Sequence, residues 1–258
     1  GGHAGMIAPA LLALGGLGLV AAFLVFTSPG ETIDNVANIN VMVDAPPGAI
    51  ANTNASAEAR ITRTGGANAT LEVFFVCEAA ATLTIEISSG EASRIDYAPE
   101  SPGPRLSNSL IPNPTLSRVD EGLKISGQCG ESKPVNVPIS VTFPARTVAA
   151  PLERGRYAFG LDLFIGNLSN LLATNSHSIG LVTPEGALLT EAFDAQGRTF
   201  NRATWEAQAQ YGLPAYGTYS VPAEVAQARW WENIILLLLG AGVGIALEAV
   251  LRRARPQP

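Results

Sequence analysis

An apolar run near the C-terminus constrains the fold more than any other feature of this sequence. Between Asn233 and Leu251 the only charged residue is Glu248. A helix rises about 1.5 Å per residue, so this run is long enough to cross the roughly 30 Å hydrocarbon core of a bilayer. We therefore expect residues 229–251 to form a transmembrane helix.

The residues on either side of this run indicate its orientation. Trp230 and Trp231 precede it, and such aromatic residues favour the headgroup level of a membrane. The tail that follows, residues 252–258, is basic and contains Arg252, Arg253 and Arg255. Because arginine clusters accumulate on the cytoplasmic side of membranes, the sequence predicts a cytoplasmic C-terminus.

A second apolar run lies near the start of the sequence. After a short tail, residues 1–5, the run from Met6 to Phe26 has 21 residues and no charge. No basic stretch precedes it and no small-x-small cleavage site follows, so we expect a membrane anchor, residues 6–27, rather than a secretory signal peptide. Two spans put both termini in the cytoplasm of a cell-membrane protein, and residues 28–228 outside the cytoplasm, for example in a periplasm.

Both runs contain small residues spaced four apart, which lets helix backbones approach closely in a membrane. These are Gly18 and Ala22 in the first run, and Gly240 and Gly244 in the second. We expect these positions to pack against each other or against helices of another membrane protein, although glycine is common in membrane helices.

The middle region, residues 28–228, is acidic. It carries 12 basic and 20 acidic side chains, a net charge of −8. Such a surface repels nucleic acid and anionic lipid headgroups, so we expect neither as a partner of this region. Its two cysteines, Cys77 and Cys129, predict a disulfide in an oxidising compartment, with two unrelated buried thiols as the alternative.

Alternating apolar and polar residues predict β-strands through most of the middle region. The alternation is regular around Ile39–Val43 and through Thr82–Ser88, Val135–Phe143 and Tyr157–Ile165. The run Leu71–Cys77 is apolar at most positions, as is typical of a central strand. Pro138 predicts an edge or bulge position, since proline donates no ladder hydrogen bond.

Turn signals separate these short strands, and only Thr204–Gln210, around Trp205, indicates a short helix. We therefore predict a mainly β protein: an extracytoplasmic antiparallel β-sandwich, either immunoglobulin-like or jelly-roll, flanked by two single transmembrane helices.

One connection between the predicted strands is unusually long. Residues 92–117 show little periodicity and contain five prolines: Pro99, Pro102, Pro104, Pro112 and Pro114. Loops of this length are often functional, so this loop is a candidate partner-binding surface. The alternative is a long crossover between the two sheets.

Motifs for catalysis or cofactor binding are absent from the sequence. There is no nucleophile elbow, phosphate loop, dinucleotide fingerprint or zinc-protease motif. Of the two histidines, His3 and His177, only His177 lies in the middle region, where we expect an exposed loop or strand start. We therefore expect no enzyme activity, no metal and no cofactor.

The function that fits these features is a non-catalytic accessory or scaffolding subunit of a larger, hetero-oligomeric membrane complex. Its expected partners are other integral-membrane subunits and the lipid bilayer. The alternative is a membrane-anchored module that binds a ligand or carbohydrate through exposed aromatic residues. Candidates for that role are Tyr97, Trp205, Tyr211 and Tyr216, with core packing as the other interpretation of Trp205.

Overall fold

A computed structural model describes residues 37–98, 113–153, 155–167, 176–208 and 212–254. These residues fall into two compact units, a β-sandwich and the helix that follows it in the chain. The predicted first span, residues 6–27, lies outside the described residues, as do Gly18 and Ala22.

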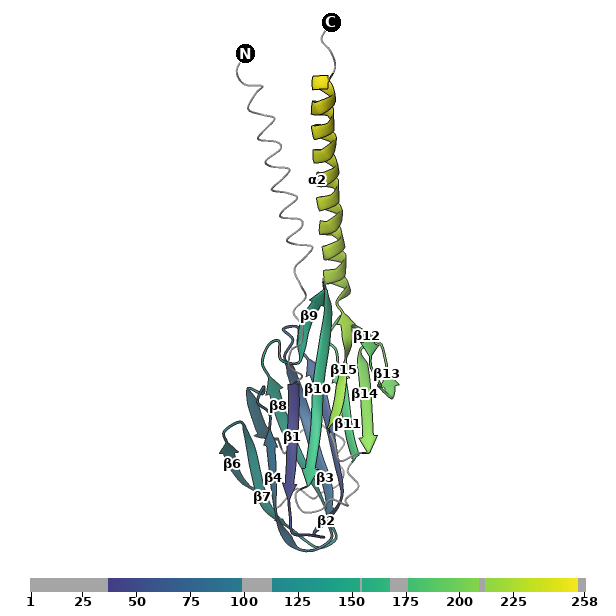
Figure 1. The fold of residues 1–258 in the computed structure, drawn as a ribbon. Coiled ribbons are helices and arrows are strands. Elements are labelled where there is room, and N and C mark those ends of the chain that lie inside the picture. The colour runs from purple at the N-terminus through teal and green to yellow at the C-terminus, as the bar shows by residue number, and fades with distance from the viewer. Residues whose placement is uncertain (1–36, 99–112, 154, 168–175, 209–211, 255–258) are drawn as a thin grey trace. The chain divides into compact units, whose positions relative to one another are not determined.

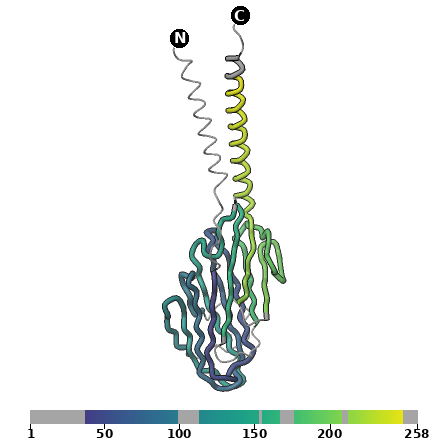
Figure 2. Tube along the Cα trace, in the orientation of Figure 1, coloured from purple at the N-terminus to yellow at the C-terminus, as the bar shows by residue number. Residues whose placement is uncertain are grey.

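The sandwich consists of two sheets (Figures 1 and 2). Sheet A contains, in spatial order, β12 (Leu188–Ala192), β15 (Leu213–Ser220), β10 (Arg156–Asn167), β1 (Ala37–Asp44), β4 (Ala81–Ser88), β7 (Gly122–Cys129) and β6 (Thr115–Val119), and β9 (Ala149–Glu153) also pairs with β10. Sheet B contains β13 (Gly197–Arg198), β14 (Arg202–Gln208), β11 (Ser176–Val182), β2 (Ile50–Ile61), β3 (Ala67–Cys77), β8 (Lys133–Phe143) and β5 (Arg94–Tyr97).

Both sheets are mixed, so the prediction of a purely antiparallel sandwich is wrong. β1 pairs with β10 in parallel, and β2 pairs with β11 in parallel. Every other pairing in the described sheets is antiparallel. The two parallel pairs arise because each early strand meets a late strand at the centre of its sheet. Alternation along one strand reveals which face is buried, but not the direction of its neighbour.

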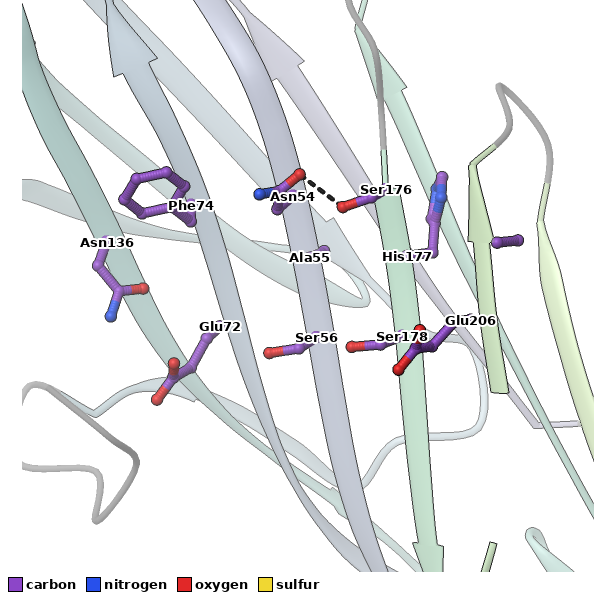
Figure 3. A pocket seen from close by; sticks show the side chains of 11 residues that line it. Asn54, Ala55, Ser56, Glu72, Phe74, Asn136, Ser176, His177, Ser178 and Glu206 are labelled. Atoms are coloured by element: carbon purple, nitrogen blue, oxygen red, sulfur yellow. Dashed lines mark hydrogen bonds between the residues drawn. The ribbon is translucent and has the colours of Figure 1, made fainter. Parts of the chain in front are cut away.

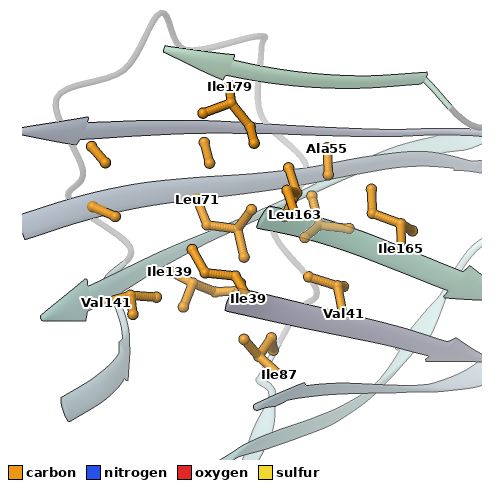
Figure 4. Packing of buried hydrophobic residues seen from close by; sticks show 14 of the residues in the cluster. Ile39, Val41, Ala55, Leu71, Ile87, Ile139, Val141, Leu163, Ile165 and Ile179 are labelled. Atoms are coloured by element: carbon orange, nitrogen blue, oxygen red, sulfur yellow. The ribbon is translucent and has the colours of Figure 1, made fainter. Parts of the chain in front are cut away.

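The core lies between the sheets and is almost entirely aliphatic. Figure 4 shows Ile39 and Leu163 of sheet A packed near Leu71 and Ile139 of sheet B. All four side chains are fully buried. Burying one such side chain contributes about 1.5–3 kcal/mol, and the alternating pattern of the sequence supplies these residues to one face of each strand.

Most of the strands expected from alternation are present. The expected central run is β3, between β2 and β8, and its alternate residues face the core. Pro138 lies in β8, one strand in from the edge, where the Pro138 carbonyl accepts a hydrogen bond from Ala98 just past the end of β5. The backbone nitrogen of Pro138 therefore faces the end of the short edge strand β5, so no hydrogen bond to β3 is lost.

The helix expected at Thr204–Gln210 does not form over its first five residues, because residues 204–208 belong to β14, and residues 209 and 210 lie outside the described residues. Trp205 pairs with Ile179 of β11 and is 1 % exposed. Strand pairing and burial of the indole override the helix propensity of the neighbouring alanine, glutamate and glutamine residues.

A tight turn between β2 and β3 requires glycine. Gly65 has φ +80°, and its carbonyl accepts hydrogen bonds from the amides of Val148 and Ala149. A Cβ at this position would overlap the Ala149 carbonyl oxygen. The turn therefore packs against the start of β9 without space for any side chain.

The second unit contains helix α2, Pro222–Ala254. It begins seven residues before residue 229, the first residue of the predicted transmembrane segment. Proline is well suited to the first turn of a helix, and Glu224 complements the positive end of the helix dipole. Residues Pro222–Glu248 are long and apolar enough to cross a membrane: an 18-residue stretch within them has a mean hydropathy of 1.7, and none of it is buried.

Candidate functional site

Polar side chains cover the outer face of sheet B in two rows that run across adjacent strands. One row contains, in strand order, Asn136, Phe74, Asn54 and Ser176. The next row, two residues along each strand, contains Pro138, Glu72, Ser56, Ser178 and Glu206. The register of five strands thus assembles one surface from residues spread over much of the chain.

These two rows line a hollow of about 570 Å³ (Figure 3). In Figure 3, Ser56, Ser178 and Glu206 project from one side of their strands. The volume falls within the range of about 300–1,000 Å³ typical of small-molecule sites. Amides, hydroxyls and carboxylates make up most of the lining, and Phe74 adds a phenyl ring.

The hollow is rich in hydrogen-bond acceptors that have no partner among the described residues. Neither Glu72 nor Glu206 makes an ion pair in the described part of the chain. The Oδ1 atom of Asn136 is buried and lacks a hydrogen-bond partner there as well. No described lysine or arginine lines the hollow, so the charge of its lining is negative.

Glu58, which lies two residues after Ser56 on β2 and outside the hollow, has a different environment from Glu72 and Glu206. Its carboxylate lies 3.6 Å from Arg60 and 3.2 Å from Arg202. Within the hollow, the Ser176 hydroxyl donates to Oδ1 of Asn54. The unpaired carboxylates are therefore a local property of the hollow rather than of the whole face.

His177 borders the hollow from the opposite side of β11 (Figure 3). It lies at the start of this strand and is 2 % exposed, so the expected strand start is present and the expected exposure is wrong. Neither ring nitrogen has a hydrogen-bond partner among the described residues. Burial lowers the pKa of the imidazole, while the charge of Asp162 and the backbone of Ala207 partly oppose this effect.

Asp162 of β10 is the charged group that influences His177. Burial raises the pKa of its carboxyl, and the backbone of Leu163 and the charge of His177 partly oppose the rise. One carboxylate oxygen is buried without a hydrogen-bond partner in the described chain. The two groups are close enough to interact electrostatically, but they form no hydrogen bond with each other.

The predicted cysteine pair is brought together by the sheets. Cys77 ends β3 in sheet B and Cys129 ends β7 in sheet A, and the two form a disulfide with Cα atoms 6.3 Å apart. This bond indicates an oxidising compartment for the sandwich.

The aromatic candidates for ligand binding have different environments. Trp205 is a core residue whose indole Nε1 donates to the Phe193 carbonyl at 2.6 Å. Tyr97 is half-buried, and burial raises the pKa of its hydroxyl. Tyr216 is 41 % exposed and stacks on Phe193 with ring centroids 5.5 Å apart, whereas Tyr211 lies outside the described residues. None of the described candidates lies in the hollow.

The expected membrane-interface and helix-packing residues of the second run lie on α2 or follow it. The rings of Trp230 and Trp231 are more than half exposed and make an edge contact at 5.0 Å. No described atom lies within 4 Å of a Cβ placed at Gly240 or Gly244. Arg252 and Arg253 are in the last turn of α2, and Arg255 lies outside the described residues.

The proline-rich segment is shorter than expected because strands form at both of its ends. β5 lies in sheet B and β6 in sheet A, so the segment crosses between the sheets, as its alternative interpretation held. Of its five prolines only Pro114 is described, and Pro99, Pro102, Pro104 and Pro112 lie outside the described residues.

The sequence analysis missed the residues of the hollow. One signal was available: Phe74 has the same alternation phase as Glu72, so it is an aromatic residue on a polar face. Most of the other members are ordinary asparagine, serine and glutamate residues on several strands. Only the strand register brings them together.

Metal binding finds no support in the described part of the chain. It contains no group of three or more histidine, cysteine, aspartate or glutamate residues arranged to hold a metal ion.

Comparisons with known proteins do not identify a family. No protein-family model matches the chain, and no curated protein matches it in sequence. The structure is similar to that of a two-domain M1 zinc metallopeptidase mutant bound to L-tryptophan, at 7% identity and a TM-score of 0.35 over 68% of this chain and 44% of that chain. It is also similar to an M1 zinc metallopeptidase mutant from Deinococcus radiodurans, at 8% identity and a TM-score of 0.35 over 67% of this chain and 42% of that chain.

The chain thus spans less than half the length of these peptidases. At such TM-scores the likeness assigns neither a fold family nor an activity.

Proposed function

We propose that this protein is a non-catalytic accessory subunit of a larger integral-membrane complex, in which α2 is an anchor and the β-sandwich is presented outside the cytoplasm. The observation that carries this proposal is the bare apolar surface of α2. Within Pro222–Glu248 an 18-residue stretch has a mean hydropathy of 1.7, and none of it is buried.

The exposed apolar side chains of α2 support a membrane environment for this helix. Leu236, Leu237, Leu238, Val243, Ile245 and Leu247 are each more than half exposed. Leaving one such side chain in water rather than burying it costs about 1.5–3 kcal/mol. Lipid or a partner helix would remove this cost.

The flanks of α2 support a cytoplasmic C-terminus. The tryptophan pair lies toward the start of the helix, and the arginine cluster follows its apolar part. The positive-inside rule then puts the sandwich on the other side of the membrane. The disulfide between Cys77 and Cys129 agrees, because such bonds persist in oxidising compartments. A first span at residues 6–27 would place the N-terminus in the cytoplasm as well.

The glycines of α2 suggest where a partner helix docks. Gly240 and Gly244 share one face of the helix, and Gly242 points away from that face. A Cβ added at any of the three would have no described neighbour within 4 Å. A partner helix can approach closely at Gly240 and Gly244.

Purification from the native membrane in mild detergent tests the accessory role. We expect the full chain to purify with an integral-membrane partner in fixed stoichiometry. Gly240→Ile with Gly244→Ile should weaken this association, whereas Gly242→Ile, the matched control on another face, should not. A chain that purifies alone and monodisperse would contradict the proposal.

Orientation is tested separately with an impermeant protease applied to intact cells. Cleavage within residues 28–228 is expected without lysis, and protection of this region until lysis would overturn the proposed topology.

A second candidate function is a membrane-anchored module that binds a ligand or carbohydrate. The hollow on the outer face of sheet B favours it, because acceptors without a described partner and an aromatic ring line a space large enough for a small molecule.

A further inference from the structure

The chemistry of the hollow restricts the ligands that it could bind. Its lining includes two carboxylates, Glu72 and Glu206, and no lysine or arginine from the described part of the chain. Phosphates, sulfates and acidic sugars would meet negative charge without a compensating cation, so the site disfavours anions.

The unpaired acceptors call for a ligand that donates several hydrogen bonds. Glu72 and Glu206 make no ion pair in the described part of the chain. A carboxylate accepts several hydrogen bonds and donates none when ionised. Hydroxyl groups of a ligand, arranged along the rows, would supply the missing donors. The strongest of the resulting hydrogen bonds would be the charge-assisted bonds to the two carboxylates.

Phe74 adds an apolar surface to the otherwise polar rows. It lies between Asn136 and Asn54 in cross-strand register, and it is half-buried on the outer face. The face of an aromatic ring carries partial negative charge and attracts the weakly positive C–H groups of an apolar surface. A ligand with a C–H face and a rim of hydroxyls matches this combination.

We propose that the hollow on the outer face of sheet B binds a neutral saccharide, with one sugar ring over Phe74 and its hydroxyls donating to Glu72 and Glu206. This inference rests on the second candidate function and is independent of the accessory role. The hollow spans five strands, so it accommodates a short oligosaccharide chain across the sheet.

The two carboxylates bind the ligand and do not hydrolyse it. Glu72 and Glu206 are three strand spacings apart, with β2 and β11 between their strands. At about 4.8 Å per spacing their backbones are roughly 14 Å apart. Glycoside hydrolases hold their two carboxyl groups about 5–9.5 Å apart. In Figure 3 the Glu206 side chain extends toward Ser178, and Glu72 lies farther along the row, beyond Ser56.

Binding of defined oligosaccharides to the full chain in zwitterionic lipid nanodiscs tests the proposal. Isothermal titration calorimetry would use cellotetraose, maltotetraose, mannotetraose and chitotetraose as neutral probes. Tetragalacturonate is the acidic probe and tetraglucosamine the cationic one. We expect saturable binding of at least one neutral probe, and weaker or no binding of tetragalacturonate.

Variants connect the binding to the hollow. Phe74→Ala and Glu206→Gln should each weaken binding of the neutral probe at least tenfold. Glu191→Gln is the matched control, because Glu191 is an exposed glutamate of β12 in the other sheet. Glu206 is itself exposed, so Glu206→Gln keeps the test valid if Phe74→Ala fails to fold.

Three outcomes would overturn the inference. They are no binding of any neutral probe at millimolar concentration, tighter binding of a charged probe, and binding unchanged in both hollow variants. Because partner association is measured by co-purification, failure of saccharide binding is distinguishable from failure of the accessory role.

Discussion

Cys77 and Cys129 tie the two sheets of the sandwich together, the first at the end of β3 and the second at the end of β7. Their separation of 52 residues encloses β4, β5, β6 and most of β7. The bond thus closes a loop that passes through both sheets and includes the crossover between them.

Removing this bond should lower stability substantially. In the chain-entropy model a loop of this length is worth about 4 kcal/mol. We expect Cys77→Ser with Cys129→Ser to lower the melting temperature of the sandwich by roughly 8–16 °C. Circular dichroism of the purified chain in detergent measures this, with the oxidised wild type as control. Equal melting temperatures would show that the bond contributes nothing to stability.

The buried indole of Trp205 permits a graded test. Trp205→Phe keeps most of the apolar contact but leaves the Phe193 carbonyl without its donor, at a cost of about 1–3 kcal/mol. Trp205→Ala also opens a cavity and should cost about 3–5 kcal/mol. Urea denaturation of both variants would check the order. Trp230→Ala, at an exposed position on α2, should leave the sandwich transition unchanged.

Two glycines with similar backbone angles should respond differently to alanine. Gly48 and Gly65 have φ +74° and +80°, but only Gly65 has described neighbours where a Cβ would stand. Gly48→Ala should cost about 1–2 kcal/mol from the left-handed conformation alone. Gly65→Ala adds overlap with the Ala149 backbone, so we expect a loss of at least about 3 kcal/mol. Thermal melts of the two variants distinguish these effects, and equal losses would contradict the steric argument.

The buried His177 should make stability depend on pH. Its folded-state pKa is lowered by burial, so on acidification the unfolded chain binds a proton at this residue before the folded chain does. The free energy of unfolding should therefore fall as the pH drops below the ordinary histidine pKa of about 6.5. His177→Gln removes this titration, and its urea midpoint should fall less between pH 7 and pH 5 than that of the wild type. Asp162 is present in both chains, and an identical pH dependence would rule out the role of His177.

The strands were more predictable than their arrangement. Alternation alone indicates β4 and β8, because one face of each is buried against the other sheet. The parallel pairs β1·β10 and β2·β11 join segments more than a hundred residues apart, and no local pattern encodes such a pairing. β14 was mistaken for a helix because local propensity is weaker than burial of Trp205.

The candidate site was beyond prediction for a related reason. Each hollow residue, such as Ser56 or Glu206, is an ordinary polar position of an exposed strand face. Its neighbours come from other strands, so the grouping appears only when all five strands are in register. The disulfide was easier to predict, because two cysteines in a region expected to lie outside the cytoplasm have only one possible intramolecular pairing.

The parallel pairs also determine when this protein can finish folding. β1 and β2 emerge first during synthesis, yet each needs a partner strand made more than a hundred residues later. Until β10 and β11 arrive, each of these early strands has one open edge that can pair with another chain. Such distant pairing slows folding, so we expect the nascent chain to depend on chaperones that shield those edges during export.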